Sequence, residues 1–418
     1  MSTPWGAHYL PVPNPETTLV LRLLRELGLA SNDALPRFDE RHLVHDPEDR
    51  LFHRGKWYPG LYLRAGATDR DLAELERFET LCAVLRAAVG RDGRLFFALP
   101  VALGSRDPEV LRLDRLTMAQ YLVEQGFTSE RLRWHVDYAC RDDYGASIDV
   151  VSAWAGLQYF AGRRPWQVPE TDGSHYFTWP EGNARLVRHL AARVPDLRTG
   201  WLALSVERTG HVLAVELATE TVVRFECEAV VLAAPNHVVA RLTRGERGGF
   251  ATAAPWLVAS VQLRERPPQD EEPAWNNVLT RSTSVGYVEC AHQCVERHRE
   301  AVWAWYEPLP PSDRSWLLDA DHSRLASRVL RDLRPAHGDL SPNLTRLDVW
   351  RWGHGTVIPT IGLLSDAGRL LSAEPWGRVH VAHTDLSGLP LFEEAQYHGV
   401  RAAEAALSDL QVQSHSWL

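Results

Sequence analysis

His354 is the residue of this sequence whose side chain is most readily linked to catalysis. It lies in the segment Trp352-Gly353-His354-Gly355. An unperturbed imidazole titrates near neutral pH, so it can both accept and donate a proton. General acid–base catalysis by His354 is therefore one interpretation, and a structural role for the ring is the other.

A second group of reactive side chains has residue types that bind metals: Cys290, His292, Cys294 and His298. Zinc would require the four side chains to converge tetrahedrally. The spacing of Cys290, Cys294 and His298 would align them on one helix, but residues 287–290 have the pattern of a strand. We therefore predict no metal site.

A third candidate lies near the C-terminus, where an apolar run at 379–382 is followed by a polar loop at 383–388 and a predicted helix from about 392 to 407. A strand end, a loop of small residues and a helix N-terminus together present backbone N–H groups and a positive dipole. They suit a pyrophosphate or the electron-rich edge of a flavin. Asp385 in the loop could accept a hydrogen bond from a ribityl or ribose hydroxyl. One face of the helix has small residues at steps of four, three and four, so another backbone should pack closely there.

The elements that position these residues begin with helices. Apolar spacing predicts a helix from residue 16 to 27 and a mainly helical block over about 66–162. Within that block, Thr68 and Asp71 have the spacing of a capping box for a helix over 69–89. Further helices are expected near 117–125, 129–138 and 148–160, so this block should form one helical subdomain.

The rest of the chain is richer in strands. Three short runs at 202–207, 212–217 and 222–227 predict a meander. The apolar run at 229–235 is typical of a strand buried on both faces of a parallel sheet. A second sheet is expected over about 256–352, from strands near 257–263, 286–290, 301–306 and 344–350 and a helix near 323–333.

Three segments, in this order, resemble the flavin amine oxidase superfamily. The first is Trp179-Pro180-Glu181-Gly182-Asn183 before a helix, similar to the turn at which the family's substrate domain returns to its FAD domain. The second is the meander and the strand that ends in Ala233-Ala234-Pro235. The third runs from Gly377 to Asp385 and on through Ser387-Gly388 into the last helix, and it resembles the family's C-terminal FAD-binding signature. Trp5-Gly6-Ala7-His8 also resembles the family's turn near the flavin.

The resemblance implies an α/β protein with an FAD domain of the amine oxidase type and an α+β substrate domain. The expected FAD domain comprises residues 1–28, 176–245 and 365–410, the substrate domain 29–175 and 246–364, and a frayed tail 411–418. Trp352 and His354 are the implied catalytic residues, at the reactive face of the flavin. The implied cofactor-binding residues are Gly6, Ala7, Ala203, Pro235, Ala382, His383, Thr384, Asp385, Ser387, Phe392, Glu393 and Glu394.

The sequence departs from the family pattern in three places. The family's G-x-G-x-x-G turn binds the pyrophosphate, but Gly353-His354-Gly355 is the only G-x-G here and the third glycine is missing. We therefore expect an N-terminally incomplete FAD domain. The acid of the C-terminal signature, Asp385, comes two positions late. The family's lysine near flavin N5 has no counterpart, because the only lysine, Lys56, lies in a turn-rich stretch that predicts a surface position.

Composition narrows the class of protein further. The 418 residues are 45% hydrophobic with a net charge of −9, spread along the chain, which argues against a nucleic-acid or anionic-membrane surface. Five cysteines, an odd number, predict free thiols in a reducing, cytoplasmic compartment.

Two functions are therefore expected as alternatives. The first is an FAD-dependent oxidoreductase that removes a hydride from a C–N or C–C bond of a small organic molecule at flavin N5. The second is a non-catalytic remnant or binding protein that keeps the scaffold without FAD.

Overall fold

The largest sheet of the protein joins two distant parts of the sequence. A computed structural model describes residues 3–164, 166, 176–268, 273–292 and 299–418. Its seven-stranded sheet has the strand order β13-β9-β12-β11-β10-β2-β3. The strands are β2 (Asp49–His53), β3 (Lys56–Pro59), β9 (Ala253–Leu263), β10 (Asn276–Leu279), β11 (Gly286–Glu289), β12 (Ala301–Pro308) and β13 (Leu344–Val357).

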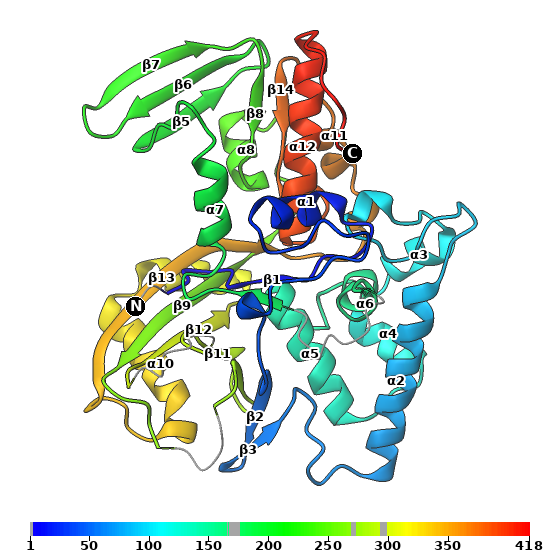
Figure 1. The fold of residues 1–418 in the computed structure, drawn as a ribbon, viewed down its shortest axis with the longest axis vertical. Coiled ribbons are helices and arrows are strands. Elements are labelled where there is room, and N and C mark those ends of the chain that lie inside the picture. The colour runs from blue at the N-terminus through cyan, green and yellow to red at the C-terminus, as the bar shows by residue number, and fades with distance from the viewer. Residues whose placement is uncertain (1–2, 165, 167–175, 269–272, 293–298) are drawn as a thin grey trace.

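The predicted second sheet is confirmed, and so is the helix that covers it. Both α9 (Arg314–Asp319) and α10 (His322–His337) lie on one face of the sheet (Figure 1). Leu325, Val329 and Leu333 of α10 are buried in one cluster with Trp303 and Trp305 of β12. This burial fixes β9, β12 and β13 as a rigid base for the residues that follow along β13.

The hairpin β2–β3 was not predicted. Its turn, Arg54-Gly55, has positive φ at both positions (49° and 84°), which matches a two-residue hairpin turn. The turn residues were recognised in the sequence, but the short flanking strands lack the alternation that marks a strand. Lys56, at the start of β3, is exposed as predicted.

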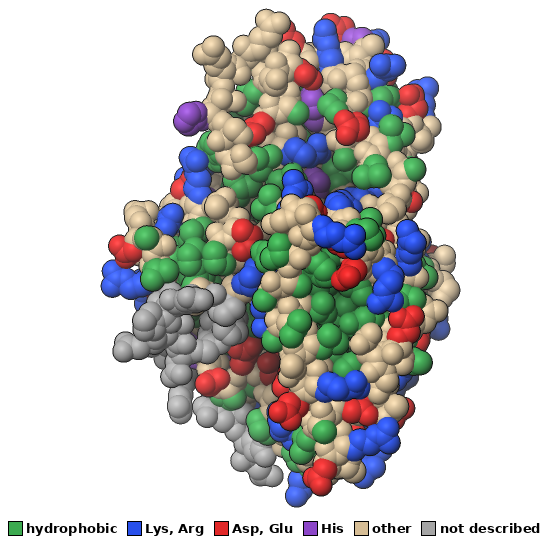
Figure 2. All heavy atoms as spheres, turned by 90° about the vertical axis from the view of Figure 1, so that its right-hand side faces the viewer, with side chains coloured by type: hydrophobic (Ala, Val, Ile, Leu, Met, Phe, Trp, Pro, Cys, Tyr) green, Lys and Arg blue, Asp and Glu red, His purple; other side chains and the backbone are tan. Residues whose placement is uncertain are grey.

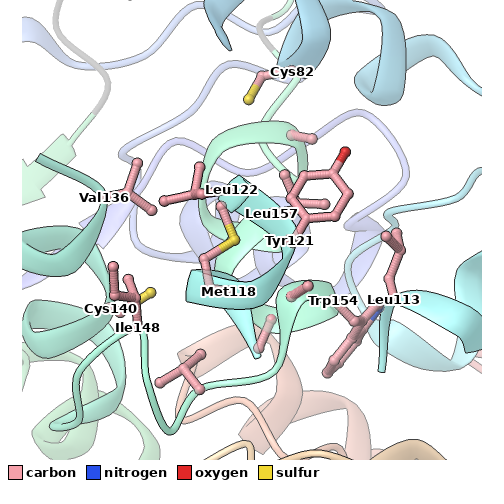
Figure 3. Close-up of a cluster of buried hydrophobic side chains, with 14 of the residues drawn as sticks. Cys82, Leu113, Met118, Tyr121, Leu122, Val136, Cys140, Ile148, Trp154 and Leu157 are labelled. Carbon is pink, nitrogen blue, oxygen red and sulfur yellow. The ribbon is translucent and has the colours of Figure 1, made fainter. Parts of the chain in front are cut away.

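The helical subdomain is confirmed. It contains α2 (Asp69–Ala87), α3 (Pro108–Leu113), α4 (Met118–Glu124), α5 (Glu130–Tyr144) and α6 (Ala153–Ala161). Their apolar faces meet in one core, in which Met118, Leu122, Val136 and Leu157 are almost fully buried (Figure 3). The last of these helices begins later than expected, because Ser152 caps it through a hydrogen bond to Ala155 N–H.

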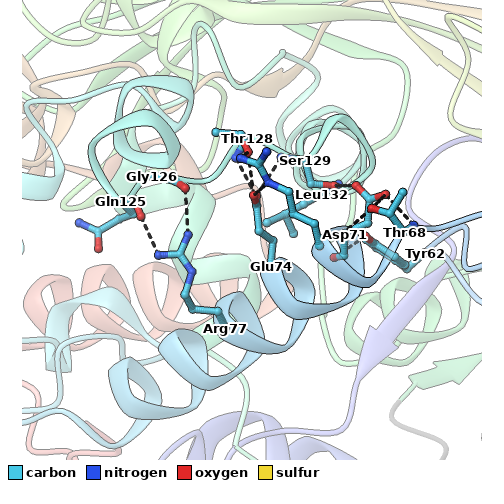
Figure 4. A network of polar contacts seen from close by, with 11 residues as sticks. Tyr62, Thr68, Asp71, Glu74, Arg77, Gln125, Gly126, Thr128, Ser129 and Leu132 are labelled. Atoms are coloured by element: carbon cyan, nitrogen blue, oxygen red, sulfur yellow. Dashed lines mark hydrogen bonds and ion pairs between the residues drawn. The ribbon is translucent and has the colours of Figure 1, made fainter.

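The N-terminus of α2 is fixed by the predicted capping box and by hydrogen bonds between its second turn and the loop before α5 (Figure 4). Thr68 Oγ1 accepts from Asp71 N–H at 3.2 Å, and Asp71 accepts from Thr68 N–H at 2.9 Å. One turn later, the Glu74 carboxylate accepts from the backbone N–H groups of Thr128 and Ser129. This helix is therefore held at its start by both its own cap and the loop before α5.

Thr68→Ala should destabilise the protein by about 1 kcal/mol, because the change removes the cap acceptor for an exposed helix start. The measurement is the urea midpoint followed by circular dichroism. Thr199→Ala is the matched control, since Thr199 is exposed and makes no hydrogen bond with a described residue. Equal midpoints for the two variants would contradict the prediction.

A smaller parallel sheet forms the third part, in the upper half of Figure 1. Here β8 (Val230–Leu232) pairs in parallel with β14 (Val379–Val381). Around them lie the predicted meander β5 (Trp201–Val206), β6 (His211–Glu216) and β7 (Thr221–Glu226), and the helices α1 (Thr18–Glu26), α7 (Ala184–Ala191), α8 (Asn236–Leu242), α11 (Ala367–Ala373) and α12 (Phe392–Asp409). The short pair β1 (Tyr9–Pro11) and β4 (Tyr176–Thr178) lies between this part and the large sheet.

The expectation that the strand at 229–235 is buried on both faces is wrong. Leu232 packs with α8, but Val231, on the opposite face, is 44% exposed. On that face α12 covers the neighbouring His380, which pairs with Asp409 at 3.2 Å, and it leaves Val231 open. The apolar run alone did not reveal how far the covering helix extends.

The C-terminal tail lies against the first helix. Residues 411–418 form no helix or strand, and the Arg22 guanidinium lies 3.5 Å from the centroid of the Trp417 ring. On the face shown in Figure 2, basic and acidic side chains are intermixed. None of the helices that the structure describes is both long and apolar enough to cross a membrane.

Candidate active site

A cavity of about 1330 Å³ lies where the three parts of the protein meet. Its walls come from the N-terminal segment (residues 3–11), from β9 and β13, from the start of α7, and from the loop and first turn that connect β14 to α12. The large sheet fixes one wall and the small parallel sheet fixes the opposite wall. A ligand in this cavity would therefore contact segments from both ends of the chain.

The predicted turn at 182–183 holds the N-terminal segment against the cavity. Gly182 has φ +61°, and a Cβ atom there would lie 2.8 Å from the carbonyl oxygen of Ala7, so only glycine fits. Asn183 donates from its backbone N–H to Ala7 O and from Nδ2 to Tyr9 O, at 3.2 and 3.0 Å. The family-like turn therefore has a physical role, which is to position residues 6–9.

Eight of the predicted site residues are brought together as lining of this cavity. They come from four separate segments: Gly6, Ala7, Trp352, His354, His383, Thr384, Phe392 and Glu393.

Four other predicted residues lie directly beside those segments and do not line the cavity. Ala382 precedes the loop, Ser387 lies near its end, Pro235 precedes α8 as its N-cap, and Asp385 is buried. Asp385 Oδ2 accepts from the backbone N–H and the Nδ2 of Asn236, at 2.8 and 2.9 Å. Burial alone would raise the pKa of Asp385, but its contacts with His383 and Asn236 lower it below the ordinary value. This carboxylate therefore ties the loop to α8.

Ala203 lies elsewhere. It is an exposed residue of β5, in the three-stranded meander, and it is not among the described residues that line the cavity.

Glu394, also predicted, is fully buried behind the cavity wall. It accepts from the backbone N–H of Val101 at 2.8 Å and from the hydroxyl of Ser387. The same hydroxyl lies 2.7 Å from Nε2 of His398. Burial raises the pKa of Glu394 to about 7 and lowers the pKa of His398 to about 3. This network joins α12, the cavity loop and the helical subdomain.

His354 lies against His237, which no pattern in the sequence singles out. The rings of His354 and His237 are stacked with centroids 3.8 Å apart and an angle of 14° between the planes. Burial, the neighbouring His237 and Arg314 all lower the pKa of His354 below 6.5. At neutral pH His354 is therefore a neutral base on the cavity wall, and it makes no hydrogen bond with a described residue.

Tryptophans form the adjoining wall. Trp352 Nε1 donates to the carbonyl oxygen of Trp5 at 2.6 Å, and the rings of Trp5 and Trp350 are stacked at 5.5 Å. These contacts fasten the N-terminal segment to β13. The predicted pocket residue Trp352 thus also holds the turn at Gly6 in place.

A smaller space, here called the inner chamber, adjoins the cavity. Its volume is about 40 Å³, and His8, Tyr9, Asp142 and Tyr306 line both spaces. Three carboxylates line the chamber: Glu48, Asp49 and Asp142. None of them was selected from the sequence, although the adjacent acids Asp142 and Asp143 near the end of α5 were a visible signal.

Burial and mutual repulsion make these carboxyl groups weak acids. Burial, with Asp143 and Asp49 nearby, raises the pKa of Asp142 to about 8. Burial, with Asp49 and Asp46 nearby, raises the pKa of Glu48 to about 7. The pKa of His8 falls to about 4 on burial, so this ring supplies no positive charge at neutral pH.

Asp142→Asn should stabilise the ligand-free protein at pH 8 by about 2 kcal/mol and change little at pH 4. The folded state binds the Asp142 proton more tightly than the unfolded state, so its stability falls as pH rises from 3.8 through about 8. The uncharged amide of the Asp142→Asn variant does not ionise, so this loss of stability with rising pH is absent. The measurement is apparent unfolding free energy against pH, with the exposed Asp149→Asn as control. Parallel pH profiles for wild type and Asp142→Asn would contradict the prediction.

The prediction of no metal site can be compared with the structure only at Cys290 and His292, because Cys294 and His298 lie outside the described residues. Cys290 follows directly after β11 and is buried. Within the described ranges, no three His, Cys, Asp or Glu side chains are arranged to hold a metal ion.

Comparison with protein families agrees with this geometry. The model of the flavin containing amine oxidoreductases matches residues 6–407 of the chain. The chain belongs to this family. The match begins at Gly6, in the turn at the cavity, and ends within the last helix. As a member of this family, the protein is an FAD-dependent oxidoreductase.

Several solved structures share the fold of this chain. Cyclohexylamine oxidase from Brevibacterium oxydans superposes with a TM-score of 0.66 at 17% identity, over 97% of this chain and 88% of that chain. Putrescine oxidase bound to putrescine gives 0.64 at 13% identity, over 96% and 88%. Reduced UDP-galactopyranose mutase gives 0.54 at 12% identity, over 96% and 95%. A search of curated proteins finds no match to the sequence.

The residues on the cavity wall fit the ring half of FAD. A Cβ atom at Gly6 would meet nothing within 4 Å, so the wall is open there for a flat ring. The first backbone N–H groups of α12, at Phe392 and Glu393, have no partner within the helix, and the cavity is beside them. They suit the electron-rich edge of the ring. For the pyrophosphate, the 418 residues contain no G-x-G-x-x-G turn.

Proposed function

We propose that this protein oxidises small organic amines by removing a hydride from the carbon next to nitrogen. Support comes from one observation above all: eight of the fourteen residues that the sequence assigned to flavin binding or catalysis, both predicted catalytic residues among them, line a single cavity. FAD, when bound, would accept the hydride at N5, and the substrate carbon and nitrogen would be left as an iminium or imine.

The chain itself would position the two reactants. Gly6, Ala7 and the first turn of α12 would hold the ring on one side, while Trp352 and His354 project from β13 on the other. Trp352 is the last residue of β13 before its regular pairing with β9 is interrupted, and His354 lies within that irregularity, between Trp352 and Thr356. Binding in such a cavity brings the reacting carbon close to the ring and displaces water.

His354 would accept a proton from the substrate. An amine reaches the site mostly as an ammonium ion, and its nitrogen must be neutral before the adjacent carbon loses a hydride. A neutral imidazole with a lowered pKa takes that proton at a ring nitrogen. His237, stacked on His354, fixes the plane of the ring.

We further propose that the enzyme acts in the cytoplasm. The buried thiols of Cys82 and Cys140 form no disulfide within the described part of the chain, which suits a reducing compartment.

A second candidate function is that of a binding protein without FAD. It is favoured by the missing glycine-rich turn, since that turn normally supplies the backbone N–H groups that bind the pyrophosphate.

The test that separates the two candidates is the visible absorption spectrum of the purified chain after addition of FAD and removal of unbound cofactor. If the flavin bands persist and are bleached by an amine in the absence of oxygen, the oxidase proposal stands. If the protein retains no flavin, the second candidate is favoured. If flavin is retained but no amine bleaches it, amine oxidation is excluded.

A further inference from the structure

The inner chamber is lined by aromatic rings and carboxylates. Tyr176 and Trp275 are stacked with centroids 5.9 Å apart, and Tyr9 meets Tyr176 edge-on at 5.0 Å. These three rings line the chamber together with Glu48, Asp49 and Asp142. Aromatic faces combined with carboxylates form a typical environment for an organic cation.

The chamber lacks a positive charge of its own. None of its three carboxylates forms an ion pair with any side chain that the structure describes, and His8 is neutral. Asp49 accepts a hydrogen bond from Asn276 Nδ2 at 2.9 Å. Arg141, whose charge acts on Asp142, pairs with Asp137 at 3.0 Å, and Arg163 pairs with Glu393.

Asp142 is the side chain that points to a ligand most directly. It is partly buried, lines both the chamber and the cavity, and makes no hydrogen bond or ion pair with a described residue. A buried carboxylate without a partner is costly, because it has lost its water without gaining a counter-charge. A cationic ligand would supply that counter-charge.

The size of the chamber limits what it can hold. A space of about 40 Å³ has room for a few water molecules or one ammonium group with its neighbouring methylene, but not for a whole substrate. Since the chamber adjoins the larger cavity, a ligand whose cationic end fills the chamber must extend into the cavity.

We propose that the inner chamber binds a second cationic group of the substrate, so that this protein prefers diamines to monoamines. This inference rests on the proposed function. One ammonium group binds at Asp142 and Glu48 in the chamber, and the other amine lies in the cavity beside His354.

The test is calorimetric binding to the purified chain at pH 9, above the pKa of about 8 of Asp142 and the pKa of about 7 of Glu48, so that both carboxylates are mostly ionised. Straight-chain α,ω-diaminoalkanes are compared with monoaminoalkanes of the same chain length. We expect one or more diamines to bind about tenfold tighter than the matched monoamine. Asp142→Asn and Glu48→Gln should each abolish that difference, whereas the exposed Asp149→Asn should keep it.

Equal affinities of diamines and monoamines, or no binding of either, would overturn the proposal. A diamine preference that survives both chamber variants would overturn it as well. These outcomes are distinct from a failure of the proposed function, which would appear as a flavin that no amine bleaches, whatever the affinities.

Discussion

Glu394→Ala is expected to destabilise the protein by about 3 kcal/mol. Glu394 is fully buried and accepts from Val101 N–H and from the Ser387 hydroxyl. Alanine leaves the Val101 N–H without an acceptor and removes a partner of Ser387, and each buried unpaired group costs about 1–3 kcal/mol. The measurement is the urea midpoint at pH 6, followed by circular dichroism and by tryptophan fluorescence.

Two variants make the cause identifiable. Glu394→Gln keeps an acceptor for Val101 and should cost about 1 kcal/mol or less. Glu404→Ala, on the same helix, removes only contacts of Glu404 with residues of the tail and should change the midpoint little. If alanine at 394 costs no more than alanine at 404, the network does not stabilise the fold.

His354→Ala is expected to slow amine-dependent flavin reduction by about 100-fold, because a positioned general base typically contributes about that much. Flavin retention and the binding of a diamine should stay within about twofold of wild type. The measurement is single-turnover bleaching of the flavin without oxygen, at pH 7. His415→Asn, in the exposed tail, is the control.

The pH profile gives an independent check on His354. In the wild type, the reduction rate should fall as pH drops through the lowered pKa of His354, because the protonated ring accepts no proton. This limb should be absent in His354→Ala. A variant that keeps both the wild-type rate and this limb would show that His354 is not the base.

Elements with local signals could be predicted from the sequence. The helix α2 has its capping box at Thr68 and Asp71 and its apolar face within one stretch of chain, so nothing distant was needed to recognise it. The strand β2 had to find its partner β10 some 227 residues away in sequence, and its own five residues show no alternation. Its existence depends on that distant pairing, which no local pattern encodes.

The residues of the candidate site also fall into those that local motifs predict and those that only the fold brings together. Gly6, His354, Thr384 and Phe392 were predicted because each lies in a motif that resembles a family segment, and the fold brings these segments to one cavity. His237 acquires significance only because it stacks on a residue 117 positions later. Asp142 belongs to no motif in the sequence, and only the fold shows that it lines both the inner chamber and the cavity.

The hydrogen bond from Val101 N–H to Glu394 also makes it possible to measure how often the cavity opens on the side of the helical subdomain. The Val101 amide can exchange its hydrogen with solvent only when it separates from α12, which requires the helical subdomain to move away from the cavity loop. Its exchange rate therefore measures how often that side of the site opens. A ligand that holds the loop and the helical subdomain together would slow the exchange of this one amide, even though it lies in the subdomain core and touches no substrate.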